Sequence, residues 1–248
     1  LDGIAKLSAE WIIKNMPELT NVKFTMYGPG CMSRALVVAA QAVGDGLTNN
    51  CIVLKGWHNL EGRYYQGGAN ALDTRPGTAA LSTLWGTPAS YGTALQFAAY
   101  CTKYGKSHDQ MAPFVVQERA NGLNFPEGFW AQHRPEPLTI EDYLAARWIA
   151  KPANLYDNDI PIMATAAYIF TTAERVGEHK QKPVYILNHA SSRTNAKSLT
   201  PSLQEVEDDT YFTGQKIYEG AGIGPDDLSF EHMYDGFPLF HQFHLEGL

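Results

Sequence analysis

The stretch MYGPGCMSRALVVAAQAVGDGLTNNCIVLKG, from Met26 to Gly56, decides the fold class of this chain. Residues 33–43 are almost wholly apolar, which predicts a helix buried on all sides. The run CIVLKG (51–56) is short and apolar, as is typical of a strand covered on both faces of a parallel sheet. Before the helix, NVKFTMY (21–27) alternates apolar and polar residues and predicts another strand. A strand, turn, buried helix and strand in this order indicate an α/β protein.

The rest of the chain continues this mixture of helices and strands. Apolar spacing predicts helices over residues 4–15, 92–104, 108–121, 139–150 and 204–220. Strands are expected over residues 162–172 and 183–191, and a strand running into a helix over 228–248. Residues 58–90 are rich in Gly, Tyr and Trp without periodicity, and we expect a long excursion over a site or an interface.

Composition excludes several classes of function. The 248 residues are 44% hydrophobic and 18% charged, which is typical of a globular protein of one or two domains. A formal net charge of −7 argues against a nucleic-acid partner, because phosphate binding needs a basic surface. No apolar run reaches the about 18 residues of a membrane span. The three cysteines lack metal or disulfide spacing, which favours a reducing cytoplasm, and we expect sequence to be missing at both ends.

The strongest local sign of a site is FEHMYDGF near the C-terminal end. It places His232, Tyr234 and Asp235 at a predicted strand-to-helix turn, where side chains reach the crevice of an α/β sheet. A tyrosine exchanges a proton with a substrate hydroxyl only if its pKa, near 10, is lowered or matched by its partner. The alternative is a half-buried aromatic residue whose hydroxyl is hydrogen-bonded.

Cys31 is the second candidate. It follows Gly30 at the start of the apolar helix, where a helix N-terminus lowers the pKa of a thiol and favours a reactive thiolate. The alternative is a buried cysteine of the core. His241 and His244 lie one helical turn apart, but no acid stands at ligand spacing beside them, so we expect no metal site.

Five motifs in order resemble the thiolase superfamily, in its sterol-carrier or lipid-transfer-protein branch. They are SRALVVAAQAVGDG, the loop-domain segment over residues 91–126, TIEDYLAARWIAKPANLYDND, AAYIFTTAER and the turn YDGFPLF. The resemblance spans nearly the whole chain. It implies a thiolase-like layered fold (αβαβα) of two related halves, incomplete at both ends. Its parts would be a partial N-terminal half (1–57), a loop or lid domain (58–155), and the remainder of the first half with the start of the second (156–248).

The chain departs from the thiolase pattern at the residues that matter for catalysis. Counting back from the buried helix puts Pro29 where the family has its nucleophilic cysteine, and Cys31 two residues later. Tyr234 replaces the histidine of the family's H-D-C-F turn, whereas the acid is kept as Asp235. The chain therefore looks like the aldolases of steroid side-chain cleavage, which resemble thiolases without the cysteine.

This resemblance implies a carbon–carbon lyase. Its reaction would be the retro-aldol cleavage of a bulky β-hydroxyacyl-CoA, with Tyr234 as base or relay, Asp235 orienting it, and Gly30, Cys31 and His232 near the pocket. No cofactor is implied beyond the CoA of the substrate. The implied assembly is a homodimer with a small acyl-CoA-binding partner built of an OB-fold and a zinc ribbon. Two alternatives stay open: a degradative thiolase that uses Cys31, and a subunit that binds acyl-CoA or lipid without catalysis.

Overall fold

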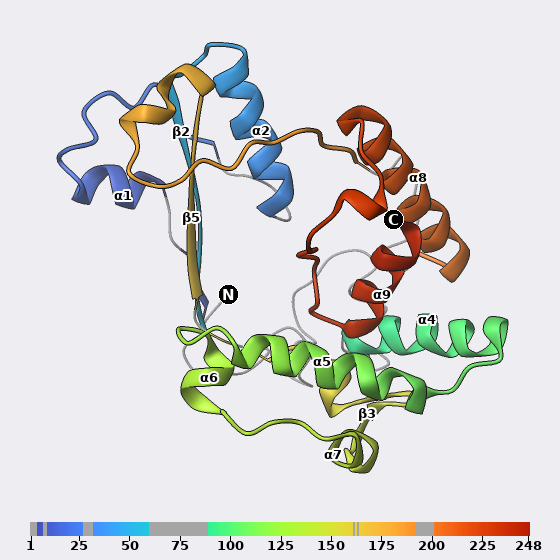
Figure 1. Cartoon of the computed structure of the whole chain (residues 1–248). Helices are drawn as coiled ribbons and strands as arrows, with labels where there is room; N and C mark the ends of the chain where they lie inside the picture. The colour runs from blue at the N-terminus through green and yellow to red at the C-terminus, as the bar shows by residue number, and fades with distance from the viewer. Residues whose placement is uncertain are drawn as a thin grey trace, which may run out of the picture. The chain divides into compact units, whose positions relative to one another are not determined.

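Two compact units make up the chain. The first joins residues 1–63 to 161–186, and the second joins residues 64–160 to 187–248. A computed structural model describes residues 4–6, 9–26, 32–59, 89–160, 162, 164–191 and 201–248 (Figure 1).

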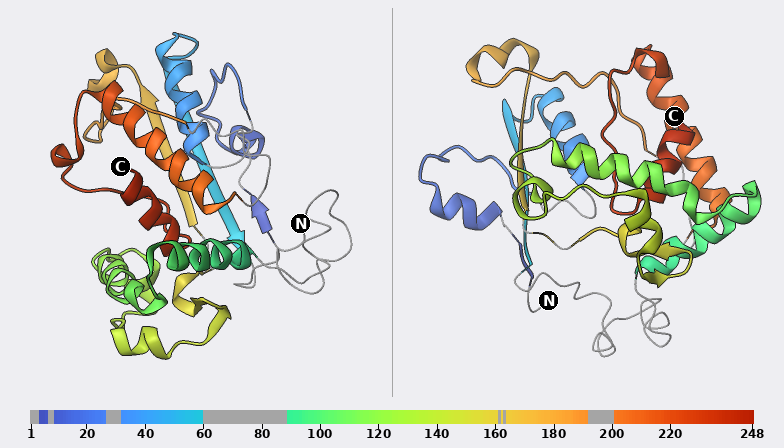
Figure 2. Two further views of the ribbon diagram at one scale, coloured as in Figure 1. Left: turned by 90° about the vertical axis from the view of Figure 1, so that its right-hand side faces the viewer. Right: turned by 60° about the horizontal axis from the view of Figure 1, so that its bottom comes forward.

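A three-stranded sheet with one long helix forms the first unit. Its order is β1 (Ile4–Lys6), β2 (Asn50–Asn59) and β5 (Ala164–Thr171), and both pairs of neighbours are antiparallel. Helix α2 (Met32–Gly44) packs against β2 and β5 and runs beside them in Figures 1 and 2. The unit also holds the short helix α1 (Ala9–Asn15) and a 3-10 segment, η4 (Ala173–Glu178).

The helix and the strand predicted from residues 26–56 are both confirmed, but their surroundings differ from the expectation. β2 lies in an antiparallel arrangement, not a parallel one, because both of its neighbours run the opposite way. Within the described residues, only Ala39, Ala42 and Val43 of α2 are buried, so the helix is not covered on all sides. Antiparallel sheets commonly keep one face open, and the exposed Ile52 agrees with this.

Three segments with a strand-like pattern do not form strands. Residues 21–26, 183–191 and 229–235 run as irregular chain, and residues 4–15 divide into β1 and α1 where a single helix was predicted. An alternating pattern becomes a strand only when a neighbouring strand completes its backbone hydrogen bonds. In the described part of the chain, these three segments pair with no such neighbour.

Helices dominate the second unit. They are α4 (Ala89–Tyr104), η2 (His108–Met111), α5 (Ala112–Leu123), α6 (Phe129–His133), α7 (Ile140–Ala145), η3 (Leu155–Asp157), α8 (Leu203–Ala221), η5 (Pro225–Asp227) and α9 (Pro238–Gly247). A two-stranded hairpin joins β3 (Trp148–Ala150) to β4 (Ala153–Asn154). Large side chains from α4, α5, α7 and α9 form its core: Phe97, Val115, Tyr143, Leu239 and Phe243.

Local sequence signals explain where these helices begin and end. Thr139 caps α7 and Ser202 caps α8, each in a reciprocal pair with an acid three residues later. Gly222 ends α8 with a φ of 68°, a left-handed conformation that glycine adopts without steric cost. The helix predicted over residues 204–220 is thus confirmed, whereas the one predicted over 139–150 ends at Ala145 and is followed by β3.

Glycine also sets how closely α8 and α9 approach each other. The two helices lie side by side in Figures 1 and 2. A methyl group on Gly214 would fall well inside van der Waals distance of the carbonyl oxygen of Gly247. The absence of a side chain at Gly214 therefore lets the two backbones touch.

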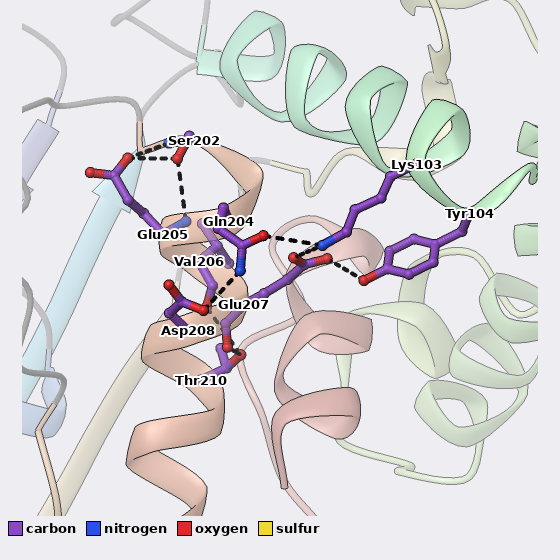
Figure 3. Close-up of polar contacts among 9 residues, drawn as sticks. All are labelled: Lys103, Tyr104, Ser202, Gln204, Glu205, Val206, Glu207, Asp208 and Thr210. Atoms are coloured by element: carbon purple, nitrogen blue, oxygen red, sulfur yellow. Dashed lines mark hydrogen bonds and ion pairs between the residues drawn. The ribbon is translucent and has the colours of Figure 1, made fainter.

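A polar cluster connects α4 to α8 at the surface (Figure 3). Glu207 accepts hydrogen bonds from the Lys103 ammonium at 2.5 Å and from the Tyr104 hydroxyl at 2.7 Å. Because Lys103 is partly exposed, this ion pair adds little to the stability of the fold. It specifies how the helices meet more than it stabilises them.

Candidate active site

The turn that carries Tyr234 leads directly into α9. Irregular chain precedes it, so the predicted strand-to-helix turn is wrong in its first half. The backbone N–H of Asp159 donates to the carbonyl oxygen of Gly236 at 2.9 Å, which fastens the turn to the chain that follows β4. A methyl group on Gly236 would collide with the hydroxyl and ring of Tyr234, so glycine permits the ring to fold over the turn.

Tyr234 is an accessible phenol among negative charges. The residue is 60% exposed, and its ring centroid lies 6.5 Å from that of Phe240. Partial burial raises the pKa of Tyr234, and the nearby carboxylates of Asp159 and Asp235 raise it further. The hydroxyl is therefore protonated at neutral pH. It can donate a hydrogen bond, or pass a proton on while accepting another.

The other predicted site residues divide into two groups. His232 and Asp235 are exposed on the same turn as Tyr234. Asp235 lies close enough to Tyr234 for its charge to raise the pKa of the Tyr234 hydroxyl. Gly30 and Cys31 lie outside the described residues. The two cysteines that the structure describes, Cys51 and Cys101, are partly buried thiols whose pKa is raised by burial.

His241 is held between two acids beside this turn. From the sequence, this histidine could be weighed only as a metal ligand. The Nδ1 atom of His241 lies 2.7 Å from the Glu118 carboxylate, and its Nε2 atom lies 2.6 Å from that of Glu231. The ring is buried, and Phe114 packs edge-on to it at 5.1 Å. We call Glu118, His241 and Glu231 the carboxylate–histidine bridge.

Glu118 differs from an ordinary surface acid in its raised pKa. Burial raises its pKa to about 7, although the hydrogen bond from His241 works in the opposite direction. The charges of Asp235 and Glu231 raise the pKa of Glu118 as well, so the bridge and the Tyr234 turn share one electrostatic environment. The sequence marks Glu118 only as an acid within the largely apolar helix α5. Sequence spacing alone does not pair it with His241, which lies 123 residues later.

A second buried polar cluster has the character of a structural support. The Tyr143 hydroxyl donates to Asp157 at 2.6 Å, and His108 Nε2 lies 2.7 Å from both residues. The backbone N–H of Asn154 donates to the same carboxylate at 2.6 Å. Because Tyr143 is fully buried and its pKa is raised by burial, the phenol stays neutral. This cluster pins α7 to η2 and to the end of the hairpin.

An open hollow of about 520 Å³ lies among α4, η2, α5 and α9. Its lining is mostly apolar, with Lys106 and Gln242 among the polar residues; Phe97, Tyr100, Met111, Phe114 and Leu245 supply apolar surface. The side-chain oxygen of Gln242 is buried without a hydrogen-bond partner in the described structure. The volume lies within the range of small-molecule pockets.

The residues that the structure describes contain neither a cluster of metal ligands nor a membrane-spanning helix. Within those residues, no three acidic, histidine or cysteine side chains gather as metal ligands would. His244 lies 2.7 Å from the carbonyl oxygen of Phe240, whereas His241 belongs to the bridge, so the two histidines have separate partners. In the same part of the chain, every helix is too short or too polar to span a membrane.

Comparison with known proteins finds relatives at low identity, and no protein-family model matches the chain. The steroid side-chain-cleaving aldolase of Thermomonospora curvata is 23% identical over 85% of this chain and 56% of its own length. The 17-hydroxy-3-oxo-4-pregnene-20-carboxyl-CoA lyase of Mycobacterium tuberculosis is 25% identical over 93% of this chain and 61% of its own length. The benzoylsuccinyl-CoA thiolase subunit BbsB of Thauera aromatica is 23% identical over 86% of this chain and 51% of its own length.

Among solved structures, the Ltp2-ChsH2(DUF35) aldolase is similar in fold. The TM-score is 0.78 at 20% identity, over 97% of this chain and 62% of that one. This likeness confirms the α/β fold class, and the first two relatives confirm the resemblance to the steroid side-chain-cleaving aldolases. The chain spans 56% and 61% of the lengths of those two relatives.

Proposed function

We propose that this chain belongs to a carbon–carbon lyase that cleaves a bulky, steroid-derived β-hydroxyacyl-CoA by a retro-aldol reaction. The products are a ketone or aldehyde and a shorter acyl-CoA. Similarity to an aldolase and a CoA lyase that act on steroids supports the reaction class. The observation that carries the proposal is the accessible Tyr234 hydroxyl, which lies in the field of the Asp159 and Asp235 carboxylates.

The chemistry of cleavage suits a neutral phenol beside carboxylates. The substrate's β-hydroxyl gives its proton to the Tyr234 oxygen while the phenol passes its own proton to Asp235 or Asp159. The carbon–carbon bond then breaks, a carbonyl forms at the former hydroxyl carbon, and the electron pair becomes the enolate of the thioester. Protonation of that enolate releases the shorter acyl-CoA. The sequence is redox-neutral and needs no covalent intermediate, so CoA enters only as part of the substrate.

The enolate needs hydrogen-bond donors aimed at its developing charge. We assign this role to backbone N–H groups near Gly30 and Cys31, which lie outside the described residues. This assignment rests on the resemblance to the thiolase superfamily.

The apolar hollow in the second unit is a candidate site for the ring system of the substrate. Its volume and its apolar lining suit a rigid hydrocarbon skeleton.

We propose that the working enzyme contains more than this chain. Each thiolase-like subunit of a homodimer would have a partial N-terminal half (1–57), a loop domain (58–155), and the remainder of the first half with the start of the second (156–248). The dimer would bind a small partner with an OB-fold and a zinc ribbon in the cytoplasm. The solved aldolase that is similar in fold carries two components, Ltp2 and ChsH2(DUF35), in its name.

Cleavage by the complete protein with its partner tests the proposal. Steroid side-chain β-hydroxyacyl-CoA thioesters are supplied, and the released ketone or aldehyde is measured. Tyr234→Phe removes the relay and should lower kcat by about 10²–10⁴. An unchanged rate in this variant would favour the non-catalytic binding subunit instead.

A thiolase reaction is the second candidate, favoured by the similarity to the benzoylsuccinyl-CoA thiolase subunit. It requires an acyl group on Cys31. The aldolase keeps its cleavage rate in Cys31→Ala, whereas a thiolase loses it. Iodoacetamide that inactivates the enzyme by labelling Cys31, at a site that otherwise carries the acyl group, would overturn the aldolase mechanism.

A further inference from the structure

The carboxylate–histidine bridge joins three separate parts of the second unit. Glu118 comes from α5, His241 from α9, and Glu231 from the chain just before the Tyr234 turn. The two ring contacts, of 2.7 Å and 2.6 Å, are within the range of charge-assisted hydrogen bonds. The bridge therefore holds the start of the turn against two helices of the core.

Counting protons shows what the bridge requires. A neutral imidazole has one N–H donor, and ionised carboxylates only accept hydrogen bonds. With neutral His241 and two ionised acids, one of the two contacts would set a ring lone pair against a carboxylate oxygen. Both contacts are hydrogen bonds only when the bridge holds one more proton, either on the ring or on one of the acids.

The surroundings favour keeping that proton as pH rises toward neutrality. Burial and the charges of Glu231 and Asp235 hold the pKa of Glu118 near 7. The ring of His241 is buried against the edge of Phe114, away from water that would compete for its nitrogens. Glu231 is the more exposed acid, with 30% of its side chain accessible against 18% for Glu118. Loss of the proton should therefore release Glu231 first.

We propose that His241 is a positioning residue that holds the Tyr234 turn in its reactive orientation while the bridge keeps its extra proton. When the proton leaves, the contact to Glu231 opens, the turn loosens, and cleavage falls on the alkaline side. This inference rests on the proposed function, in which Tyr234 moves the substrate's proton.

Glu231→Gln separates this role from a merely structural one. A carboxamide donates from its own NH₂ group, so the substituted side chain bonds to the bare nitrogen of neutral His241 without an extra proton. The alkaline loss of kcat in this variant should therefore begin at least about one pH unit higher than in the native complex. Glu231→Ala opens the bridge at every pH and should lower kcat about tenfold, with KM within about twofold.

The exposed Glu127 supplies the matched control, because Glu127→Gln removes a surface carboxylate on the same unit. It should leave the pH profile of kcat unchanged. An alkaline limb that stays in place in Glu231→Gln would overturn the proposal, as would a Glu231→Ala enzyme with native kcat.

A measurement without substrate distinguishes this inference from the proposed function. In NMR spectra of the complete protein, the carboxyl carbon of Glu118 should report loss of the bridge proton near pH 7, and the Tyr234 ring resonance should shift at the same pH. In Glu231→Gln, the Tyr234 resonance should not follow. A Tyr234 signal that ignores the bridge overturns the positioning role. If the signals behave as expected but no thioester is cleaved, only the proposed function fails.

Discussion

Asp159 and Gly236 are joined by a backbone hydrogen bond of 2.9 Å across 77 residues of sequence, from the N–H of the first to the carbonyl oxygen of the second. The bond brings the chain after β4 to the Tyr234 turn. It also brings the Asp159 carboxylate close enough to raise the pKa of Tyr234. One contact thus fixes both the position of the turn and the charge beside its phenol.

Gly236→Ala should reduce activity more than stability. The added methyl group collides with the Tyr234 hydroxyl, which is the movable end of a side chain, so the ring swings away while the fold persists. We expect kcat to fall at least about tenfold, because a displaced catalytic group loses its near-attack geometry. Gly224→Ala is the control, since a methyl group there meets no atom within 4 Å. Equal rates in both variants would show that the orientation of Tyr234 is unimportant.

Glu118 predicts how stability changes with pH. Its pKa is raised from 4.5 to about 7 in the folded chain, so its contribution is fully present below pH 4.5 and is lost as pH rises through about 7. Between pH 5 and pH 8 the free energy of unfolding should fall by about 1–3 kcal/mol from this group. Glu118→Gln should flatten the dependence in urea titrations. The same slope in the variant would assign it to another group.

Tyr143 and Tyr218, whose hydroxyl groups are both buried, should respond differently to loss of that group. Tyr143→Phe leaves the carboxylate of Asp157 without its 2.6 Å donor, and should cost about 1–3 kcal/mol of unfolding free energy. The buried hydroxyl of Tyr218 has no partner in the described structure, so Tyr218→Phe should be neutral or stabilising. Thermal unfolding of the two variants measures both. A larger loss at Tyr218 would contradict the hydrogen-bond assignment.

Filling the hollow tests the proposed site of the ring system. Leu245→Trp adds bulk to its lining and should raise KM for a steroid thioester about tenfold while kcat changes little. Leu144→Trp is the control, because Leu144 is also exposed on the second unit but does not line the hollow. Steady-state kinetics with both variants decides; similar KM values would place the ring system elsewhere.

Part of the site could be read from the sequence, because the turn is one continuous stretch. Tyr234 and Asp235 are adjacent in the chain, and their shared environment follows from that adjacency. The partners Asp159 and Glu118 could not be read in the same way, since they come from other elements of the second unit. The sequence pairs His241 only with His244, one helical turn away, whereas its ring bonds to Glu118, 123 residues earlier, and to Glu231.

Local chemistry by itself determined several of the helices and their ends. The apolar run of α2, the capping pair at Ser202 and the left-handed Gly222 each act within one or two turns of backbone. Helical hydrogen bonds close over four residues, so sequence periodicity is enough to predict them.

Tertiary structure alone decided the strand partners and the charge environment of the site. β2 pairs with β5, more than a hundred residues later, in antiparallel register, and segments with equally good alternation stay irregular where no strand meets them. Glu118 and His241 meet only because α5 and α9 pack in the same core. Such pairings depend on which surfaces are buried together, and burial is a property of the folded chain rather than of any one stretch of it.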